Sequence, residues 1–390
     1  MIAGKSYRIG IVGASSLAGK ELTDALAESP LAACDFVLLD DDDQAAGQIS
    51  AAGDEVTFIQ KLDADSFVGV DFVFFAGDAA TTARFWKAAR GAGASIVDLT
   101  YALEREPGVM VRGPWAGLAA EGRASLRVQE PDLTTPAVTA AHPAAVMLLL
   151  IASRLHARFP MRAISATVFE PASEHGRAAM DELHQQTVSL LSFQSLPREQ
   201  YGTQVAFNLM PSLGEVARVK LAETKDRIAE HYAVLSAGTA PELALQLVQA
   251  PVFHGYVASV LVELNGTATA EELELAVYGD YVDVVAAESD PPSNISAAGQ
   301  PEILVRVTST EAGDGPTDRF WFWLAADNLK LAALNAIACA SELGRLRPQG
   351  KVQSLDRIVM RRDGGTGRRS GLKIRRSQGR GGSTPPPGTR

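Results

Sequence analysis

The N-terminal residues 8–19, RIGIVGASSLAG, carry the clearest local signal of architecture in this chain. Arg8–Val12 is a short apolar run, typical of a buried strand, and it stops at Gly13. Apolar side chains then recur near the spacing of one helix face, at Leu17, Leu22, Ala25 and Leu26. A strand, a glycine turn and a helix in direct succession are typical of the opening of a parallel α/β sheet.

Further strands and helices follow over the first 141 residues. Short apolar runs predict strands at 35–39, 71–75, 95–99 and 138–141, and a helix is expected at 81–90. Because strands alternate with helices, we predict a Rossmann-like, doubly wound parallel sheet domain over residues 1–141. His142–Pro143 then begins a helix that runs to about His156, since proline is favoured in a first helical turn.

The pattern changes after Met161. The sequence predicts strands at 163–169, 257–264, 282–286, 303–308 and 319–324, the last two paired across Gly313–Gly315. It also predicts long amphipathic helices at 174–193 and 214–232. We expect an α+β domain over residues 142–325, and a final amphipathic helix at 328–346 within the segment 326–346.

Charge is distributed unevenly along the chain. Residues 361–390 hold nine Lys/Arg and one Asp, so this segment carries +8. Since the whole chain carries −10, residues 1–360 carry −18. Residues 347–390 are rich in Gly, Arg, Ser and Pro and are expected to be a disordered basic tail. The acidic body argues against nucleic-acid binding by the folded part.

The cysteines and the apolar runs indicate in which cellular compartment the protein is expected. Cys34 and Cys339 are far apart and match no metal spacing, so we expect neither a disulfide framework nor a metal centre, and a reducing cytoplasm fits. The N-terminal residues lack the apolar region of a secretory signal. The apolar run 144–152 is too short to span a membrane. The sequence therefore predicts a cytoplasmic protein with no membrane partner.

The glycine turn is a candidate nucleotide site. In a dinucleotide fold such a turn brings backbone N–H groups and a helix N-terminus to the pyrophosphate. Here the candidate residues are Gly13, Ser15, Ser16, Leu17 and Gly19, with Ser16 where a middle glycine is expected. The second strand ends in four aspartates, and Asp40 is placed to accept from a ribose 2′-OH. These carboxylates favour NAD over NADP, although a solvated acidic loop is an equally good interpretation.

Five segments together resemble the aspartate-semialdehyde dehydrogenase family. They occur in the family's order and span about residues 7–346: VGASSLAGKEL, FEPASEHGRAAMDELHQQT, VAFNLMPSLGE, VQAPVFHGYVASVLVEL and AADNLKLAALNAIACASEL. The resemblance implies a dinucleotide-binding domain, a dimerisation and substrate domain, and a closing helix that returns to the first domain. It also implies a homodimer, with contacts from the 174–193 helix and the second-domain strands.

The resemblance further implies a specific chemistry. In that family a cysteine thiolate attacks an aldehyde, hydride leaves to NADP or NAD, and phosphate releases the acyl group. A histidine acts as acid and base, and arginines hold the anionic substrate. The cysteine lies in an N-P-N-C segment at a helix start, where the helix N-terminus lowers a thiol pKa.

Four of the family's functional positions carry other residue types here. The N-P-N-C segment matches His142-Pro143-Ala144-Ala145, so the nucleophile position is Ala145, whose methyl group cannot form a covalent adduct. The histidine of the family's G-H pair is Tyr256, with His254 before the glycine. The substrate arginine is Gln249 and a glutamine is Glu170. Ser173, Asn208 and Lys220 or Arg218 remain as the resemblance expects.

Three functional hypotheses remain. The first is a non-catalytic homologue that keeps the dimer and a nucleotide site. The second is an oxidoreductase with altered chemistry, whose base would be His142, His175, Glu170 or Tyr256. The third is a surface or nucleic-acid binder that acts through residues 347–390. The missing nucleophile favours the first, because removing the nucleophile of a covalent enzyme costs on the order of 10⁶ in rate.

Overall fold

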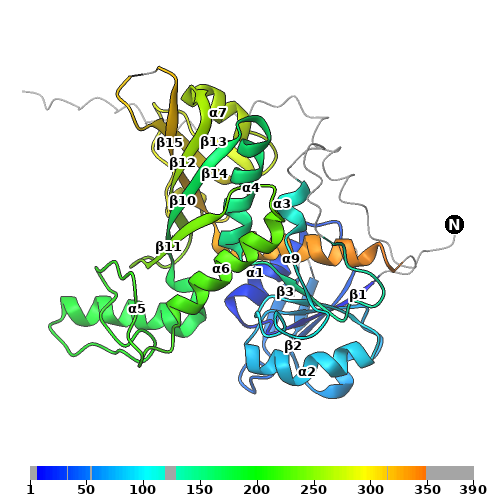
Figure 1. The fold of residues 1–390 in the computed structure, drawn as a ribbon. Coiled ribbons are helices and arrows are strands. Elements are labelled where there is room, and N and C mark those ends of the chain that lie inside the picture. Colours follow the sequence, from blue (N-terminus) through cyan, green and yellow to red (C-terminus); the bar gives the residue numbers. More distant parts are fainter. Residues whose placement is uncertain (1–6, 33, 53–54, 119–128, 314, 348–390) are drawn as a thin grey trace, which may run out of the picture. The chain divides into compact units, whose positions relative to one another are not determined.

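The computed structural model describes residues 7–32, 34–52, 55–118, 129–313 and 315–347. Two large sheets and their covering helices make up these residues (Figure 1). The predicted disordered tail lies outside the described residues except for Arg347, and Asp314 of the predicted turn also lies outside them.

The first sheet has seven strands in the order β5-β2-β1-β6-β7-β9-β8, and every neighbouring pair is parallel. The strands are β1 (Arg8–Val12), β2 (Asp35–Asp40), β5 (Gln60–Lys61), β6 (Phe72–Phe75), β7 (Ser95–Asp98), β8 (Met110–Arg112) and β9 (Val138–Ala140). The chain runs from β1 outward to β2 and then returns to the other side of β1 at β6. The predicted doubly wound α/β sheet is therefore confirmed.

Helices cover both faces of this sheet. The helix α1 (Leu17–Ala27) and the closing helix α9 (Asn328–Gly344) share one core with Ile9, Ile11 and Phe72. On the opposite face, α2 (Ala79–Gly91) contributes Trp86 to a second core with Phe75. The closing helix thus packs on the first sheet, as the fold prediction expected. Figure 1 shows α9 beside α1.

The second sheet has six strands in the order β11-β10-β12-β15-β14-β13, with both parallel and antiparallel neighbours. The strands are β10 (Met161–Glu170), β11 (Leu243–Gln249), β12 (Tyr256–Ala268), β13 (Val282–Val284), β14 (Ile303–Ser309) and β15 (Thr317–Ala326). Alternate residues of β10, β12 and β15 are buried, so one face packs on the molecule and the other is partly exposed.

The helix α4 (Pro143–Arg158) lies at the centre of the molecule. His142 caps it, and its residues from Pro143 to Leu155 are all buried. It contacts α6 (Leu221–Ser236) and α7 (Ala270–Val277), both of which pack with the second sheet. Its apolar run is therefore a core helix. In the described part of the chain no helix is long and apolar enough to cross a membrane.

Several predicted boundaries were wrong. A helix was expected from residue 214, but α6 begins at Leu221, because Gly214 lies in a turn and residues 214–220 offer no Ser, Thr, Asp or Asn cap. The expected 174–193 helix is α5 (Gly176–Leu191), preceded by a 3₁₀ turn at Ala172–His175. The prediction missed β11 entirely. It also missed short elements, namely β3 (Ile49–Ala52), β4 (Glu55–Phe58), β5, β8, α3 (Pro114–Leu118), α7, α8 (Asn294–Ala297) and a 3₁₀ turn at Ala64–Phe67.

Candidate functional site

A cleft of about 400 Å³ lies at the carboxyl edge of the first sheet. Its first wall is the glycine loop and the residues that follow β6 and β7. Its second wall comes from the 3₁₀ turn at Ala172–His175, from α6 and from the start of α9. In open α/β sheets ligands bind outside the carboxyl ends of the strands where the strand order reverses, which is the β1–β6 boundary here.

The glycine loop is closely packed against the sheet. Gly13 has φ +82°, and a Cβ on it would lie 2.2 Å from Gly77 Cα. A Cβ on Gly19 would lie 2.1 Å from the Gly13 carbonyl oxygen. The loop therefore requires glycine at both Gly13 and Gly19, since no larger residue fits at either position.

The first turn of α1 faces the cleft with free amides. Leu17 and Ala18 line the cleft, and within the described residues their N–H groups make no hydrogen bond. Ser15 N–H is already used, because it donates to Asp40 Oδ2 at 3.0 Å. Two amides at a helix N-terminus fit a diphosphate, because they supply donors and a positive dipole end.

Ser16 has a structural role that differs from the expected one. Its hydroxyl donates to the Ala76 carbonyl at 2.7 Å and accepts from Gly19 N–H at 2.8 Å. It is therefore the N-cap of α1 and ties the loop to the end of β6. In this structure the hydroxyl proton of Ser16 is therefore used within the loop.

Asp40 also differs from its expected role. Its carboxylate is buried beneath the loop, where it accepts from Ser15 N–H and from Asp42 N–H, and it does not line the cleft. The sequence offered no arginine beside the four aspartates, yet α2 brings Arg84 onto Asp41, and Lys61 lies 2.6 Å from Asp43. These contacts are tertiary and leave no trace in the local sequence.

Ala145 occupies the position at which the resemblance expects the nucleophile. Ala145 lies in the first turn of α4 and is 0% exposed, three residues after the cleft-lining His142. Neither cysteine substitutes for it. Cys339 is buried in the core of the first sheet, and Cys34 precedes β2 at the amino edge, opposite the cleft. Burial raises the pKa of the Cys34 thiol and raises that of Cys339 well above its ordinary value.

The other three altered positions lie side by side in the second sheet. Glu170 ends β10, Gln249 ends β11 in direct register with it, and Tyr256 begins β12. All three are fully buried. Gln249 Nε2 donates to the Glu170 carbonyl at 3.0 Å, so it links the two strand ends.

A buried pair joins Glu170 to the 3₁₀ turn. His175 Nε2 lies 2.7 Å from Glu170 Oε2. Although burial alone would lower it, the pKa of His175 is raised by the adjacent carboxylate of Glu170. The pair is not at a solvent edge, because Glu170 is buried and His175 is nearly so. Because His175 Nε2 is engaged by the Glu170 carboxylate, this nitrogen is not a free base for the cleft.

Glu174 is a second carboxylate, and it lines the cleft directly. His142 Nε2 lies 3.2 Å from its Oε1, and Asn328 Nδ2 donates to its Oε2 at 3.1 Å. Burial alone would raise the pKa of Glu174, but His142, Tyr256 and His175 hold it at about 2. The same Asn328 accepts from Ser173 Oγ and Gly255 N–H, so one amide ties the turn to the β12 start.

The basic residue of the cleft is already paired. Arg227 of α6 donates to both carboxylate oxygens of Glu104, at 3.0 and 3.2 Å, and its guanidinium lies over the Tyr101 ring. His231 Nε2 contacts the same carboxylate at 3.2 Å. Although burial opposes ionisation, His231 and Arg227 hold the pKa of Glu104 at about 2. No charge on Arg227 is left for an anionic ligand.

Of the remaining residues that the resemblance implied, Ser173 lines this cleft, whereas Asn208, Arg218 and Lys220 do not. Asn208, Arg218 and Lys220 are exposed, and Lys220 Nζ donates to the Glu215 carbonyl at 3.2 Å. His254 precedes β12 in a bend and does not line the cleft either. Among the described residues no group of three His, Cys, Asp or Glu side chains is placed to hold a metal ion.

Sequence reasoning missed four residues that shape the cleft: Tyr101, Glu104, Glu174 and Asn328. Glu174 and Asn328 stand inside two of the quoted family segments, so their proximity to the site could have been noticed. No local sequence pattern points to Tyr101 or Glu104. They lie in the loop that follows β7, where Tyr101 adopts φ +62°.

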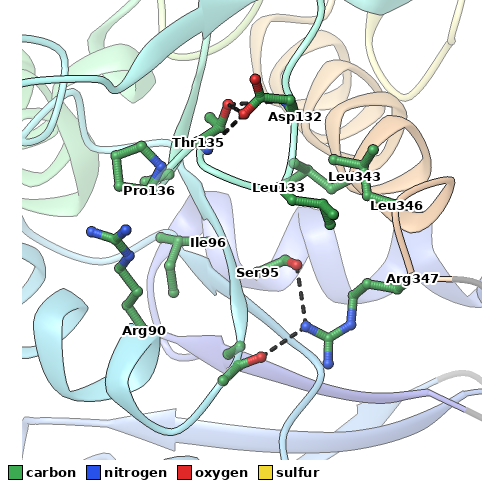
Figure 2. A pocket seen from close by; sticks show the side chains of 13 residues that line it. Arg90, Ser95, Ile96, Asp132, Leu133, Thr135, Pro136, Leu343, Leu346 and Arg347 are labelled. Atoms are coloured by element: carbon green, nitrogen blue, oxygen red, sulfur yellow. Dashed lines mark hydrogen bonds between the residues drawn. The ribbon is translucent and has the colours of Figure 1, made fainter.

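A second hollow, of about 220 Å³, lies at the opposite edge of the first sheet (Figure 2). It lies where β7 begins, beside Ser95, Leu343 and Arg347. The Arg347 guanidinium donates to the Gly93 carbonyl at 2.7 Å and to Asp71 Oδ1 at 2.9 Å. This hollow is thus separate from the cleft, and its arginine serves to hold the end of α9 on the sheet.

The fold and the cleft define a class of protein. A glycine loop on a parallel sheet, faced by a mixed sheet across a cleft, is typical of two-domain oxidoreductases that bind a dinucleotide. The chain matches the family model "Semialdehyde dehydrogenase, NAD binding domain" over residues 8–143 and "Semialdehyde dehydrogenase, dimerisation domain" over residues 153–331. The chain belongs to the semialdehyde dehydrogenase family.

Individual relatives agree with this assignment. The USG-1 protein homolog of Pseudomonas aeruginosa is 30% identical over 84% of this chain and 95% of its own length. The aspartate-semialdehyde dehydrogenase of Rickettsia bellii is 24% identical over 87% of this chain and 98% of its own length. The solved structure of a probable aspartate-semialdehyde dehydrogenase from Pseudomonas aeruginosa has a TM-score of 0.72 at 26% identity, covering 87% of this chain and 98% of that one.

Proposed function

We propose that this chain binds a nicotinamide dinucleotide and forms a homodimer, but does not catalyse the phosphate-dependent oxidation of aspartate semialdehyde. The substrate is taken from relatives named aspartate-semialdehyde dehydrogenase, such as that of Rickettsia bellii. The observation that carries the proposal is Ala145, a buried methyl group in the first turn of α4 where the resemblance expects the nucleophile.

The surroundings of Ala145 support the same proposal. A phosphate-dependent reaction needs positive charge for the substrate carboxylate and for the phosphate. Gln249 stands where the resemblance expects the arginine that holds the substrate, and Arg227 is paired with Glu104. Glu170 and Glu174 add two carboxylates near the cleft. An anionic substrate would meet net negative charge there.

The alternative, an oxidoreductase with altered chemistry, needs a free base in the cleft, and the candidate bases do not provide one. His142 Nδ1 accepts from Ala144 N–H at 3.2 Å, while its Nε2 faces Glu174. His175 is paired with Glu170, and Tyr256 is buried. Burial raises the pKa of Tyr256 well above its ordinary value. None of these groups presents a free basic atom to the cleft.

Nucleotide binding rests on the free amides of Leu17 and Ala18 and on the glycine packing of the loop. These residues would hold the diphosphate, and the bound nucleotide would supply only a hydride acceptor. We propose NAD rather than NADP, because among the described residues only Arg84 and Lys61 pair with the four aspartates Asp40–Asp43 at the end of β2.

The proposal is tested by intact-mass spectrometry after incubation with aspartate semialdehyde and NAD. We expect the mass of the protein to stay unchanged, while isothermal titration shows NAD binding. An acyl adduct mapped to Cys34 or Cys339 would overturn the proposed loss of chemistry. An absence of NAD and NADP binding would overturn the proposed nucleotide site.

A further inference from the structure

The half of the cleft that lies away from the aspartates at the end of β2 is lined by the 3₁₀ turn at Ala172–His175. The dinucleotide of a doubly wound sheet lies across the strand-order reversal, with its adenosine half at the end of the second strand. The acidic end of β2 therefore marks the adenosine side. The other half lies toward Thr100, Tyr101 and the wall that carries Glu174, where the cleft continues. This inference rests on the proposed nucleotide site.

The charges that face this half can be paired off one by one. Arg227 is paired with Glu104, and His175 is paired with Glu170. Asp78 lines the cleft as the N-cap of α2 and adds negative charge. Glu174 is held by His142 and Asn328.

The two close neighbours of Glu174 are an amide and an imidazole. Asn328 Nδ2 donates to Glu174 Oε2, and His142 Nδ1 accepts from Ala144 N–H, so the ring hydrogen is on Nε2, which lies 3.2 Å from Glu174 Oε1. The Glu174 carboxylate thus keeps its negative charge in a buried setting, where charge interactions are stronger than in water. A ligand that carries a positive charge on this side would be stabilised.

Nicotinamide dinucleotides differ at this end by one charge. The oxidised ring carries a formal positive charge and the reduced ring carries none, whereas the rest of the molecule is unchanged. We propose that the cleft discriminates the redox state of its nucleotide, and that Glu174 selects the oxidised form over the reduced form. Combined with the missing nucleophile, this selectivity describes a protein that responds to the oxidised nucleotide without consuming it.

The test is a comparison of two dissociation constants. Isothermal titration of the full chain with NAD⁺ and with NADH, at the same ionic strength, is expected to show the oxidised form binding about tenfold more tightly, the ratio for one charge pair about 12 Å apart at an effective dielectric constant of about 20. The Glu174→Gln variant should bring this ratio close to one. Glu174→Asp, which keeps the charge, should retain a preference for NAD⁺.

A matched control removes one carboxylate elsewhere. Glu271→Gln lies on the exposed face of α7 and should leave the ratio as in the parent chain. Since the readout is a ratio, a general loss of affinity that affects both forms equally does not imitate the effect. Equal binding of NAD⁺ and NADH by the parent chain, or tighter NADH binding, would overturn this inference and leave the nucleotide site intact. Binding of neither form would overturn both.

Discussion

At the scale of single residues, the proposed loss of the family's chemistry depends on a few side chains. Ala145 has no reactive atom, and the two cysteines lie in or beside the core of the first sheet with thiols of raised pKa. Glu170, Gln249 and Tyr256 adjoin one another at three strand ends, so their replacement changes one continuous site. The loop glycines, in contrast, still have the packing that a dinucleotide turn needs.

The loop glycines lead to a first prediction. Gly19→Ala would bring its methyl carbon to 2.1 Å from the Gly13 carbonyl oxygen, so the loop must shift. We expect a loss of roughly 2 kcal/mol or more in unfolding free energy and loss of NAD affinity. The control is Gly91→Ala in α2, where nothing lies within 4 Å of the added carbon. Thermal unfolding should be unchanged or slightly raised in the control; equal melting temperatures for both variants would contradict the packing argument.

A second prediction concerns acid stability. Glu104 has its pKa held at about 2, below the ordinary value of 4.5, so its ion pairs stabilise the fold above pH 4.5. That contribution, about 2 kcal/mol for a partly exposed group, is lost as the pH falls from 4.5 toward 2. In urea titrations between pH 6 and pH 3, Glu104→Gln should show a smaller decline in unfolding free energy than the parent chain. Glu230→Gln, an exposed change on α6, serves as control and should decline like the parent.

At the scale of elements, the two sheets were predicted more fully than the site. Strong apolar runs such as 9–12 and 72–75 made the first sheet recognisable, because buried parallel strands consist almost entirely of apolar residues. The strand β11 was missed although Leu243, Leu245 and Leu247 alternate in it. The start of α6 was misplaced because its terminus lacks a capping side chain. The domain limits 1–141, 142–325 and 326–346 stay predictions.

The site itself could be predicted only where the resemblance supplied a position. The aligned residues Glu170, Gln249 and Tyr256 do gather at one place. The pairing of Arg84 with Asp41, of Arg227 with Glu104 and of Asn328 with Glu174 depends on contacts between residues 43 to 154 positions apart. No local pattern encodes such contacts, and they decide which charges remain free.

A third prediction tests how α9 is held on the first sheet. Arg112 of β8 and Glu342 of α9 form a buried pair, with Arg112 Nε donating to Glu342 Oε2 at 2.9 Å. Glu342→Leu leaves a buried guanidinium unpaired and should cost about 3–5 kcal/mol of unfolding free energy. The double variant Arg112→Met/Glu342→Leu should recover much of that loss. A double variant as unstable as the single one, measured by urea unfolding, would refute the ion-pair explanation.

At the scale of the whole molecule, one face of the second sheet exposes aromatic side chains. Trp321 and Trp323 of β15 are 43% and 38% exposed on the side opposite the packed helices. The family model that covers residues 153–331 is a dimerisation domain, and contiguous exposed aromatic surface is typical of a protein interface. We propose that this face contributes to the homodimer, as the resemblance implied for the second-domain strands.

The fourth prediction follows from that face. Trp321→Glu should convert the dimer to a monomer at micromolar concentration, because an unpaired carboxylate in an apolar contact costs several kcal/mol. Light scattering coupled to size-exclusion chromatography measures the mass directly. Val68→Glu introduces the same charge at an exposed position of the first domain and should leave the mass unchanged. A Trp321→Glu protein that remains dimeric would exclude this face as the interface.

The most direct test of the central claim is the absorbance at 340 nm of purified protein supplied with aspartate semialdehyde, phosphate and NAD or NADP. With Ala145 in the first turn of α4, we predict no formation of reduced nucleotide above the rate without protein, even at enzyme concentrations that would reveal a single turnover. Steady, phosphate-dependent production of reduced nucleotide by the unaltered chain would contradict the account.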